Sequence, residues 1–241
     1  GGGRWEAAAA AAERGDGDAA LPPTLPCLDW APVWCSAGAG VPGAESAPTA
    51  TIWRPLPPPG YAAAGDVVAP GREPPPVPVT VYRVNGEDDR EGGRAAAAPS
   101  PPTAPPTGFR LVWRHDGDRP LALWAPIPAP GYVALGACAR GTPTPVRGLR
   151  ARAKALARPD VRSVATVRAD LAAPAMLYDS PLWAADPAAA ARAAGAPPPH
   201  PYDPAGLPVA LWPVDAPAGG FVVGRSPREA PDGFGWRAVF D

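Results

Sequence analysis

The sequence predicts an all-β fold, in the form of a duplicated β-sandwich-like or β-prism-like module with Ala/Pro-rich loops. Three observations lead to this prediction. Short strand-like segments recur in the same order along the 241 residues. Most of these segments end at proline or glycine, which mark turns between strands. Forty prolines and 27 glycines would favour low complexity, but the nine tryptophans are too many for a wholly disordered chain.

The chain opens with a low-complexity lead-in, residues 1–26. The alanine-rich segment 6–14 favours a short helix, since alanine is the best helix former. The first residues, GGGRWE, contain no initiator methionine and no signal-peptide pattern. This beginning favours a piece of a longer chain or an incompletely predicted gene.

The remainder, residues 27–241, is predicted to form one all-β domain. Its parts are two pseudo-repeats (27–84 and 108–183), a partial third (184–241) and a flexible linker at 85–107 that is rich in charged residues, alanine and proline. A few strands cannot bury both of their own faces, so neither copy is expected to be stable alone.

The two copies align on their aromatic strands. Trp34 lies 79 positions before Trp113, within the similar segments LDWAPVWC and GFRLVWR. The next strands, TIWR and LALW, are only 71 positions apart, which places an eight-residue insertion within 36–50 of the first copy. A later pair matches at a spacing of 85, from Arg83 to Arg168, so fourteen extra residues fall around 147–159 of the second copy.

The third copy is represented by two tryptophan strands. SPLW, ending at Trp183, is similar to the opening strand of each earlier copy, and VALWP (209–213) is similar to the IWRP strand. Helical periodicity is confined to the lead-in and to the basic insert RGLRARAKALAR (147–158).

The repeated motif is a tryptophan strand, a proline-rich corner and a Gly-Tyr return: TIWRPLPPPGYAAAGD in the first copy and LALWAPIPAPGYVALGA in the second. Its predicted framework positions are Trp53, Pro55, Gly60, Tyr61 and Gly65, and Trp124, Pro126, Gly131, Tyr132 and Gly136. Proline ends a strand because it cannot donate to the ladder. Arg54 becomes Ala125 in the second copy, so the arginine is not expected to carry the fold. The motif favours a structural corner, although Trp and Pro surfaces also dock Pro-rich peptides.

No group of residues indicates reaction chemistry. His115 is expected in a solvated hairpin loop, and the Ser, Asp and His residues near Tyr178 and His200 lack any nucleophile signature. The three cysteines (Cys27, Cys35 and Cys138) form no CxxC pair, which favours a reducing compartment. The sequence therefore predicts no catalytic residue, no metal and no cofactor. A net charge of −1 gives no reason to expect nucleic acid as a partner.

The basic insert contains five cationic residues within twelve positions: Arg147, Arg150, Arg152, Lys154 and Arg158. A run of this kind is most often a solvated loop. The alternative is a contact with anionic lipid headgroups, to which each basic residue adds about 1 kcal/mol near the surface.

The repeated segments resemble the vacuolar protein sorting-associated protein 62 family, which is related to the adaptor-binding repeats of vacuolar protein sorting-associated protein 13. The matching segments are IWRPLPPPGY with AAAGDV (52–67), FRLVWR (109–114), ALWAPIPAPGYVALGAC (122–138), VRADLAAPAMLYDSPLW (167–183) and VALWPVDAPAGGFVVGRS (209–226).

This resemblance implies a non-catalytic protein-interaction module that acts in membrane trafficking or lipid transfer. The implied partners are adaptor proteins or Pro-containing peptides, and the implied location is cytoplasmic or peripheral on organelle membranes. The alternative function is that of a peripheral membrane-binding β-prism-like domain, which would recognise anionic lipid through the basic insert. An enzyme is the third possibility.

Overall fold

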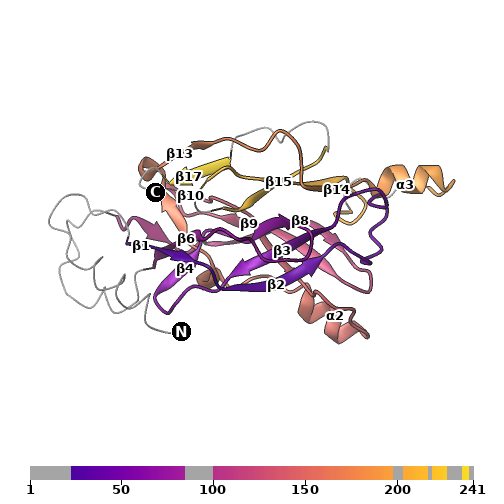
Figure 1. Cartoon of the computed structure of the whole chain (residues 1–241), viewed down its shortest axis with the longest axis horizontal. Helices are drawn as coiled ribbons and strands as arrows, with labels where there is room; N and C mark the ends of the chain where they lie inside the picture. The colour runs from indigo at the N-terminus through magenta and orange to yellow at the C-terminus, as the bar shows by residue number, and fades with distance from the viewer. Residues whose placement is uncertain (1–22, 85–99, 198–202, 217–218, 227–234, 239–241) are drawn as a thin grey trace.

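The computed structural model describes residues 23–84, 100–197, 203–216, 219–226 and 235–238. Their strands form five three-stranded sheets and one two-stranded sheet, and every pairing between strands is antiparallel. The prediction of an all-β fold is confirmed (Figure 1). The helix predicted at 6–14 lies outside the described residues.

Repeat 1 consists of two three-stranded sheets. Its strands are β1 (Thr24–Cys27), β2 (Trp30–Cys35), β3 (Ala50–Pro55), β4 (Tyr61–Ala63), β5 (Val67–Pro70) and β6 (Val79–Arg83). The sheet orders are β2-β3-β5 and β1-β6-β4. The central strand β3 carries the tryptophan motif, and the proline corner leads from it into the second sheet.

Repeat 2 has the same two sheets, with orders β8-β9-β11 and β10-β12-β7. Its strands are β7 (Thr103–Ala104), β8 (Gly108–His115), β9 (Leu121–Ile127), β10 (Tyr132–Val133), β11 (Cys138–Gly141) and β12 (Thr166–Arg168). The registers correspond residue by residue, since Tyr61 lies opposite Arg83 and Tyr132 opposite Arg168.

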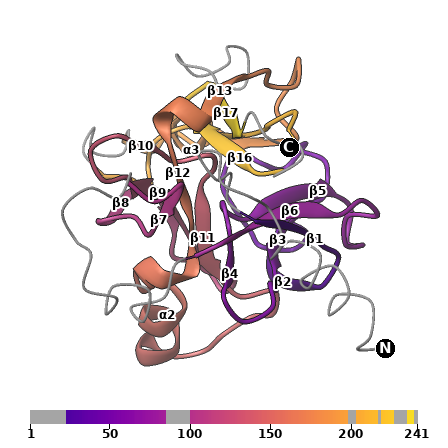
Figure 2. The ribbon, with the colours of Figure 1, turned by 90° about the vertical axis from the view of Figure 1, so that its left-hand side faces the viewer.

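Repeat 3 has one three-stranded sheet, β14-β15-β16, and one described pair, β13-β17. Its strands are β13 (Ala172–Ala175), β14 (Trp183–Ala185), β15 (Val209–Pro213), β16 (Phe221–Gly224) and β17 (Gly235–Ala238). Figure 2 shows the three repeats around a common centre, with repeat 1 at the lower right, repeat 2 at the left and repeat 3 at the top. Of the two predicted alternatives, this arrangement corresponds to the β-prism-like one.

The first strand of each repeat begins before the boundary expected from the sequence. β1 starts inside the predicted lead-in (1–26), β7 lies inside the predicted linker (85–107), and β13 lies inside the predicted second copy (108–183). These strands are two to four residues long and rich in Ala, Thr and Pro, so they show no alternating apolar pattern. They form by pairing with the last strand of their own repeat.

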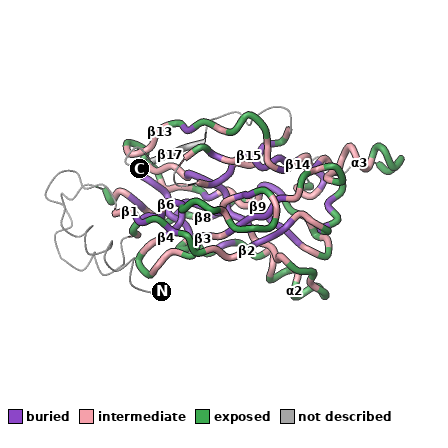
Figure 3. The backbone as a smooth tube through the Cα atoms, viewed as in Figure 1, coloured by how far each residue is buried: buried purple, intermediate pink, exposed green. Residues whose placement is uncertain are grey.

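Three tryptophans from three different repeats form the centre of the core. Trp34, Trp113 and Trp183 are almost completely buried, and their rings meet edge to face. The centroid of Trp183 lies 5.3 Å from that of Trp34 and 6.3 Å from that of Trp113. Figure 3 shows the buried residues gathered along the middle of the molecule. Because all three repeats contribute residues to this core, the repeats stabilise one another.

Two described helices extend from the β core, α2 (Leu149–Ala155) and α3 (Pro187–Ala193), and neither contains a buried residue. The described residues also form two short 3₁₀ turns, η2 (Val161–Ser163) and η3 (Ala169–Leu171). α2 lies in the insert with helical periodicity. α3 lies in an Ala/Pro stretch with no apolar stripe. It begins at Pro187, which suits the first helical position because an amide there would have no partner within the helix, and the Asp186 carboxylate caps it by accepting from the Ala189 amide at 2.8 Å.

Replacing the central tryptophan tests whether the three repeats share one core. Trp183→Ala is expected to lower the free energy of unfolding by about 3–5 kcal/mol, because it removes a buried ring that touches two other repeats. Urea denaturation followed by circular dichroism measures the change. Trp124→Ala is the control, since that ring is half-buried on β9 and should cost less. Equal losses in the two variants would contradict a shared core.

Candidate functional site

The proline corners of the repeated motif form matching turns. Gly60 and Gly131 have φ angles of +83° and +84°, a region that other residues enter only with strain. In each turn the following tyrosine amide, of Tyr61 or Tyr132, donates to the carbonyl three residues earlier, at 3.1 and 3.0 Å. Both corners thus serve to turn the chain from one sheet into the next.

The other framework positions hold the repeats together. Trp53, Pro55 and Pro126 are buried in β3 and β9, beside the half-buried Trp124. A Cβ atom on Gly65 would lie 2.7 Å from the Ala137 carbonyl oxygen, so that glycine allows two repeats to approach closely.

Backbone hydrogen bonds join the repeats at these glycines. The Asp66 amide donates to the Ala137 carbonyl at 3.0 Å, and the Ala137 amide donates to the Phe221 carbonyl at 2.9 Å. These two bonds connect repeat 1 to repeat 2 and repeat 2 to repeat 3. Gly136, which precedes Ala137, would place a Cβ 3.5 Å from the Cα atom of Gly220.

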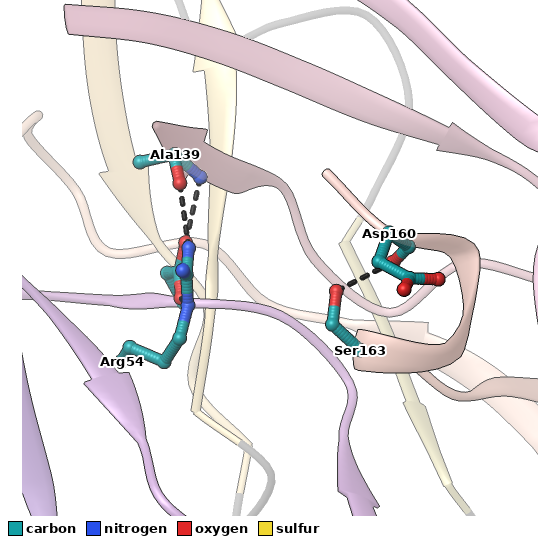
Figure 4. A network of polar contacts seen from close by, with 5 residues as sticks. Arg54, Ala139, Asp160 and Ser163 are labelled. Carbon is teal, nitrogen blue, oxygen red and sulfur yellow. Dashed lines mark hydrogen bonds and ion pairs between the residues drawn. The ribbon is translucent and has the colours of Figure 1, made fainter. Parts of the chain in front are cut away.

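Arg54 has a structural role that the sequence did not predict. Its guanidinium donates two hydrogen bonds to the Asp66 carboxylate, each at 2.8 Å, and Nη2 also donates to the Ala139 carbonyl at 2.6 Å (Figure 4). Asp66 in turn accepts from the Ala139 amide at 2.6 Å. We call these contacts the Arg54–Asp66 clamp. The expectation that this arginine does not carry the fold is therefore wrong, because it ties repeat 1 to β11.

The electrostatics of the clamp favour the charged pair. Burial alone would lower the pKa of Arg54, but the Asp66 carboxylate outweighs burial and raises that pKa. Burial raises the pKa of the neighbouring Cys138 thiol well above its usual value. Cys27, Cys35 and Cys138 are all free and buried.

A large groove lies between repeat 1 and repeat 3, with a volume of about 1040 Å³. It is lined by β5, the start of β6, the connection between β13 and β14, and the end of β15. We call it the repeat 1–3 groove. Its volume lies at the upper end of the range for ligand sites, about 300–1,000 Å³.

The walls of the groove are mostly apolar. Val77 and Tyr178 are large side chains left 63% and 57% exposed. Four prolines also line it: Pro70, Pro78, Pro181 and Pro213. The charged residues in the lining are Asp179 and Asp215, both acidic and both exposed.

The basic insert forms the surface of α2. Four of its five cationic residues are exposed, Arg147, Arg150, Lys154 and Arg158, and Leu149 beside them is 86% exposed. The fifth behaves differently. Arg152 forms an ion pair with Asp118 at 2.9 Å and donates to the Asp116 carbonyl at 3.1 Å, which fastens α2 to the β8–β9 hairpin.

His115 does not lie in a solvated loop, as the sequence suggested. It is the last residue of β8, its Nε2 lies 3.1 Å from the Ala39 carbonyl, and its ring stacks on Trp113 with centroids 6.3 Å apart. Burial lowers its pKa. The extended strand and the long first-copy loop around Ala39 together shield it.

Sequence reasoning missed the groove. Its wall includes Tyr178, Asp179 and Ser180, a segment that the sequence analysis considered only as a possible part of a catalytic triad. The signal available in the sequence was the concentration of proline and apolar residues in the segments that line the groove. Across the described ranges, no three His, Cys, Asp or Glu side chains gather as they would around a metal ion. No helix within those ranges has the length and apolar character to cross a membrane.

No family model matches the chain, and no curated protein matches it in sequence. Its fold is similar to that of a crystal structure of GNIP1Aa from Chromobacterium piscinae, with a TM-score of 0.54 and 16% sequence identity. The match covers 84% of this chain and 32% of that one, so the chain spans about a third of the similar structure. At this identity the similarity shows an all-β fold of this kind and nothing about function.

Removing the arginine of the clamp should be costly. Arg54→Ala leaves the buried Asp66 carboxylate without its cation, so the free energy of unfolding should fall by about 3–5 kcal/mol. Arg114→Ala is the matched control, because the Arg114–Asp116 pair is about half exposed and should contribute less than about 1 kcal/mol. Denaturation in guanidinium chloride measures both. A loss for Arg54→Ala no greater than that of the control would show that the clamp is dispensable.

Proposed function

We propose that this chain is a non-catalytic protein-interaction module of the vacuolar sorting and lipid-transfer type, acting in membrane trafficking. The observation that carries the proposal is the repeat 1–3 groove, a concave surface with prolines, Val77 and an exposed Tyr178 in its walls. Grooves with aromatic walls dock extended Pro-containing peptides, which lose little conformational entropy on binding, and Tyr178 is the aromatic residue of this lining. The resemblance of the repeated motif to the adaptor-binding repeats supports the same class of partner.

The non-catalytic part of the proposal rests on how the buried ionisable groups are used. Arg54 and Asp66 neutralise each other and bind the backbone of β11. His115 is held by the Ala39 carbonyl and by the ring of Trp113. Each of these groups serves an internal contact, and none of them lines the repeat 1–3 groove.

A second candidate function is peripheral binding to anionic membranes. The α2 surface favours it, because four exposed cations surround the almost fully exposed Leu149. Basic residues next to an apolar side chain suit the headgroup region of a membrane with negative surface charge. The cytoplasmic faces of organelle membranes offer such a surface.

The adaptor function predicts capture of Pro-x-Pro peptides by the full chain. Immobilised Pro-x-Pro peptides should retain the wild-type protein, and Tyr178→Ala should reduce retention several-fold, because it removes the exposed aromatic wall of the groove. Tyr61→Ala is the control, since that tyrosine lies at the corner of repeat 1 and does not line the groove. Failure of a well-folded wild-type protein to bind any such peptide would contradict this function.

The membrane function predicts co-sedimentation with liposomes that contain phosphatidylserine. Neutralising the four exposed cations of the α2 surface (Arg147, Arg150, Lys154 and Arg158, each to Ala) should abolish it, because each contributes about 1 kcal/mol. Arg152 is left in place, since it holds α2. The control removes four exposed arginines elsewhere: Arg72, Arg83, Arg110 and Arg114. Equal binding by the two variants would rule out a role for α2.

A further inference from the structure

The edge of β5 that faces the repeat 1–3 groove carries free backbone groups. The Gly71 amide donates to the Thr49 carbonyl at 2.8 Å. In the β3–β5 register, the backbone amides and carbonyls of the odd-numbered residues of β5 therefore point towards β3. The amide and carbonyl of Val68 therefore point away from the sheet, and Val68 lines the groove. No described residue hydrogen-bonds to these two groups.

The corresponding residue of repeat 2 shows what normally occupies this place. Val68 lies opposite Ile52, and Ala139 lies opposite the equivalent Leu123. The outward amide of Ala139 donates to Asp66, and its carbonyl accepts from Arg54, both at 2.6 Å. The clamp from repeat 1 thus satisfies both outward backbone groups of Ala139.

Repeat 3 cannot do the same for β5. Pro213 corresponds to Arg54, because each follows the motif tryptophan of its strand. Phe221 corresponds to Asp66, because each precedes the residue that is paired with that tryptophan. Neither side chain has a polar group. Among the described residues, nothing bonds to the outward amide and carbonyl of Val68 or to the outward carbonyl of Pro70, along the floor of the groove.

We propose that an extended peptide with basic side chains beside apolar ones adds to β5 as a strand in the repeat 1–3 groove. In an antiparallel arrangement one peptide residue exchanges two hydrogen bonds with Val68, and the residue two positions away donates to the Pro70 carbonyl. Apolar peptide side chains contact Val77 and Tyr178. Basic ones face Asp179 and Asp215, the two charged residues of the lining.

This inference rests on the proposed interaction function, for which it names the site and the chemistry of the partner. The probe is a fluorescein-labelled heptapeptide of alternating valine and threonine, flanked by an arginine at each end, and its counterpart is flanked by glutamates. Fluorescence anisotropy at low salt should show the arginine form binding about five-fold or more tightly. The double variant Asp179→Asn/Asp215→Asn should lose the preference, and Asp29→Asn should keep it, because Asp29 is exposed outside the groove.

Two further changes test strand addition itself. Methylating the backbone nitrogen of alternate probe residues should weaken binding about ten-fold, whereas methylating the intervening ones should not, since only every second amide faces β5. Pro213→Arg should also abolish binding, because an arginine there can cap the open carbonyl of Val68 as Arg54 caps Ala139. Ala125→Arg is the matched control, since it places the same side chain at the boundary between repeats 2 and 3. Unchanged melting curves will show that each variant is folded.

The outcomes separate the site from the function. Strand addition is overturned if the arginine-flanked probe does not bind, if N-methylation has no alternating effect, or if Pro213→Arg and Ala125→Arg act alike. Capture of Pro-x-Pro adaptors by wild type and Pro213→Arg alike would retain the adaptor function and reject this site. Binding of the probe through β5 without capture of any adaptor peptide would retain the site and reject the adaptor function.

Discussion

The edge-to-face contact of Trp34, Trp113 and Trp183 is the interaction on which the rest of the structure depends. Each ring belongs to the second strand of a different repeat, so the most buried part of the molecule exists only when three repeats meet. Such contacts contribute about 0.5–1.5 kcal/mol beyond the burial of the rings. Short sheets of two or three strands become stable because their apolar faces cover one another around this centre.

A shared centre requires close contact between repeats, and the contacts are not equal. The backbone at Gly65 approaches the next repeat so closely that a Cβ atom would lie 2.7 Å from the Ala137 carbonyl oxygen, whereas a Cβ atom on Gly136 would make only ordinary van der Waals contact. Beyond these glycines the repeats differ. Repeat 1 reaches β11 with a buried ion pair, whereas the same positions of repeat 3 hold a proline and a phenylalanine. The groove lies at this third boundary.

The sequence predicted the all-β class, and its three tryptophan strands contain the rings that meet in the core. These features are visible because large aromatic residues recur at fixed spacing. β7 and β13 could not be predicted, since two to four residues of Ala, Thr and Pro become a strand only through pairing. The role of Arg54 was misjudged for a related reason. Its replacement by Ala125 suggested freedom to vary, but the Ala139 carbonyl to which it donates lies 85 positions away in β11.

Arg54, Ala125 and Pro213 occupy equivalent positions in the three repeats. The residue at this position determines whether a repeat can hydrogen-bond to the strand edge of the next one. An arginine paired with an aspartate fills the hydrogen-bonding capacity of the adjacent strand edge and fixes the boundary. An apolar residue leaves that capacity open, which is costly for buried backbone unless water or another chain supplies partners. Under the proposal of strand addition, closing a boundary and binding a ligand are alternative uses of the same strand edge. Two boundaries lack the clamp, and at the one between repeats 3 and 1 the open strand edge lines the groove in which we propose that a partner binds.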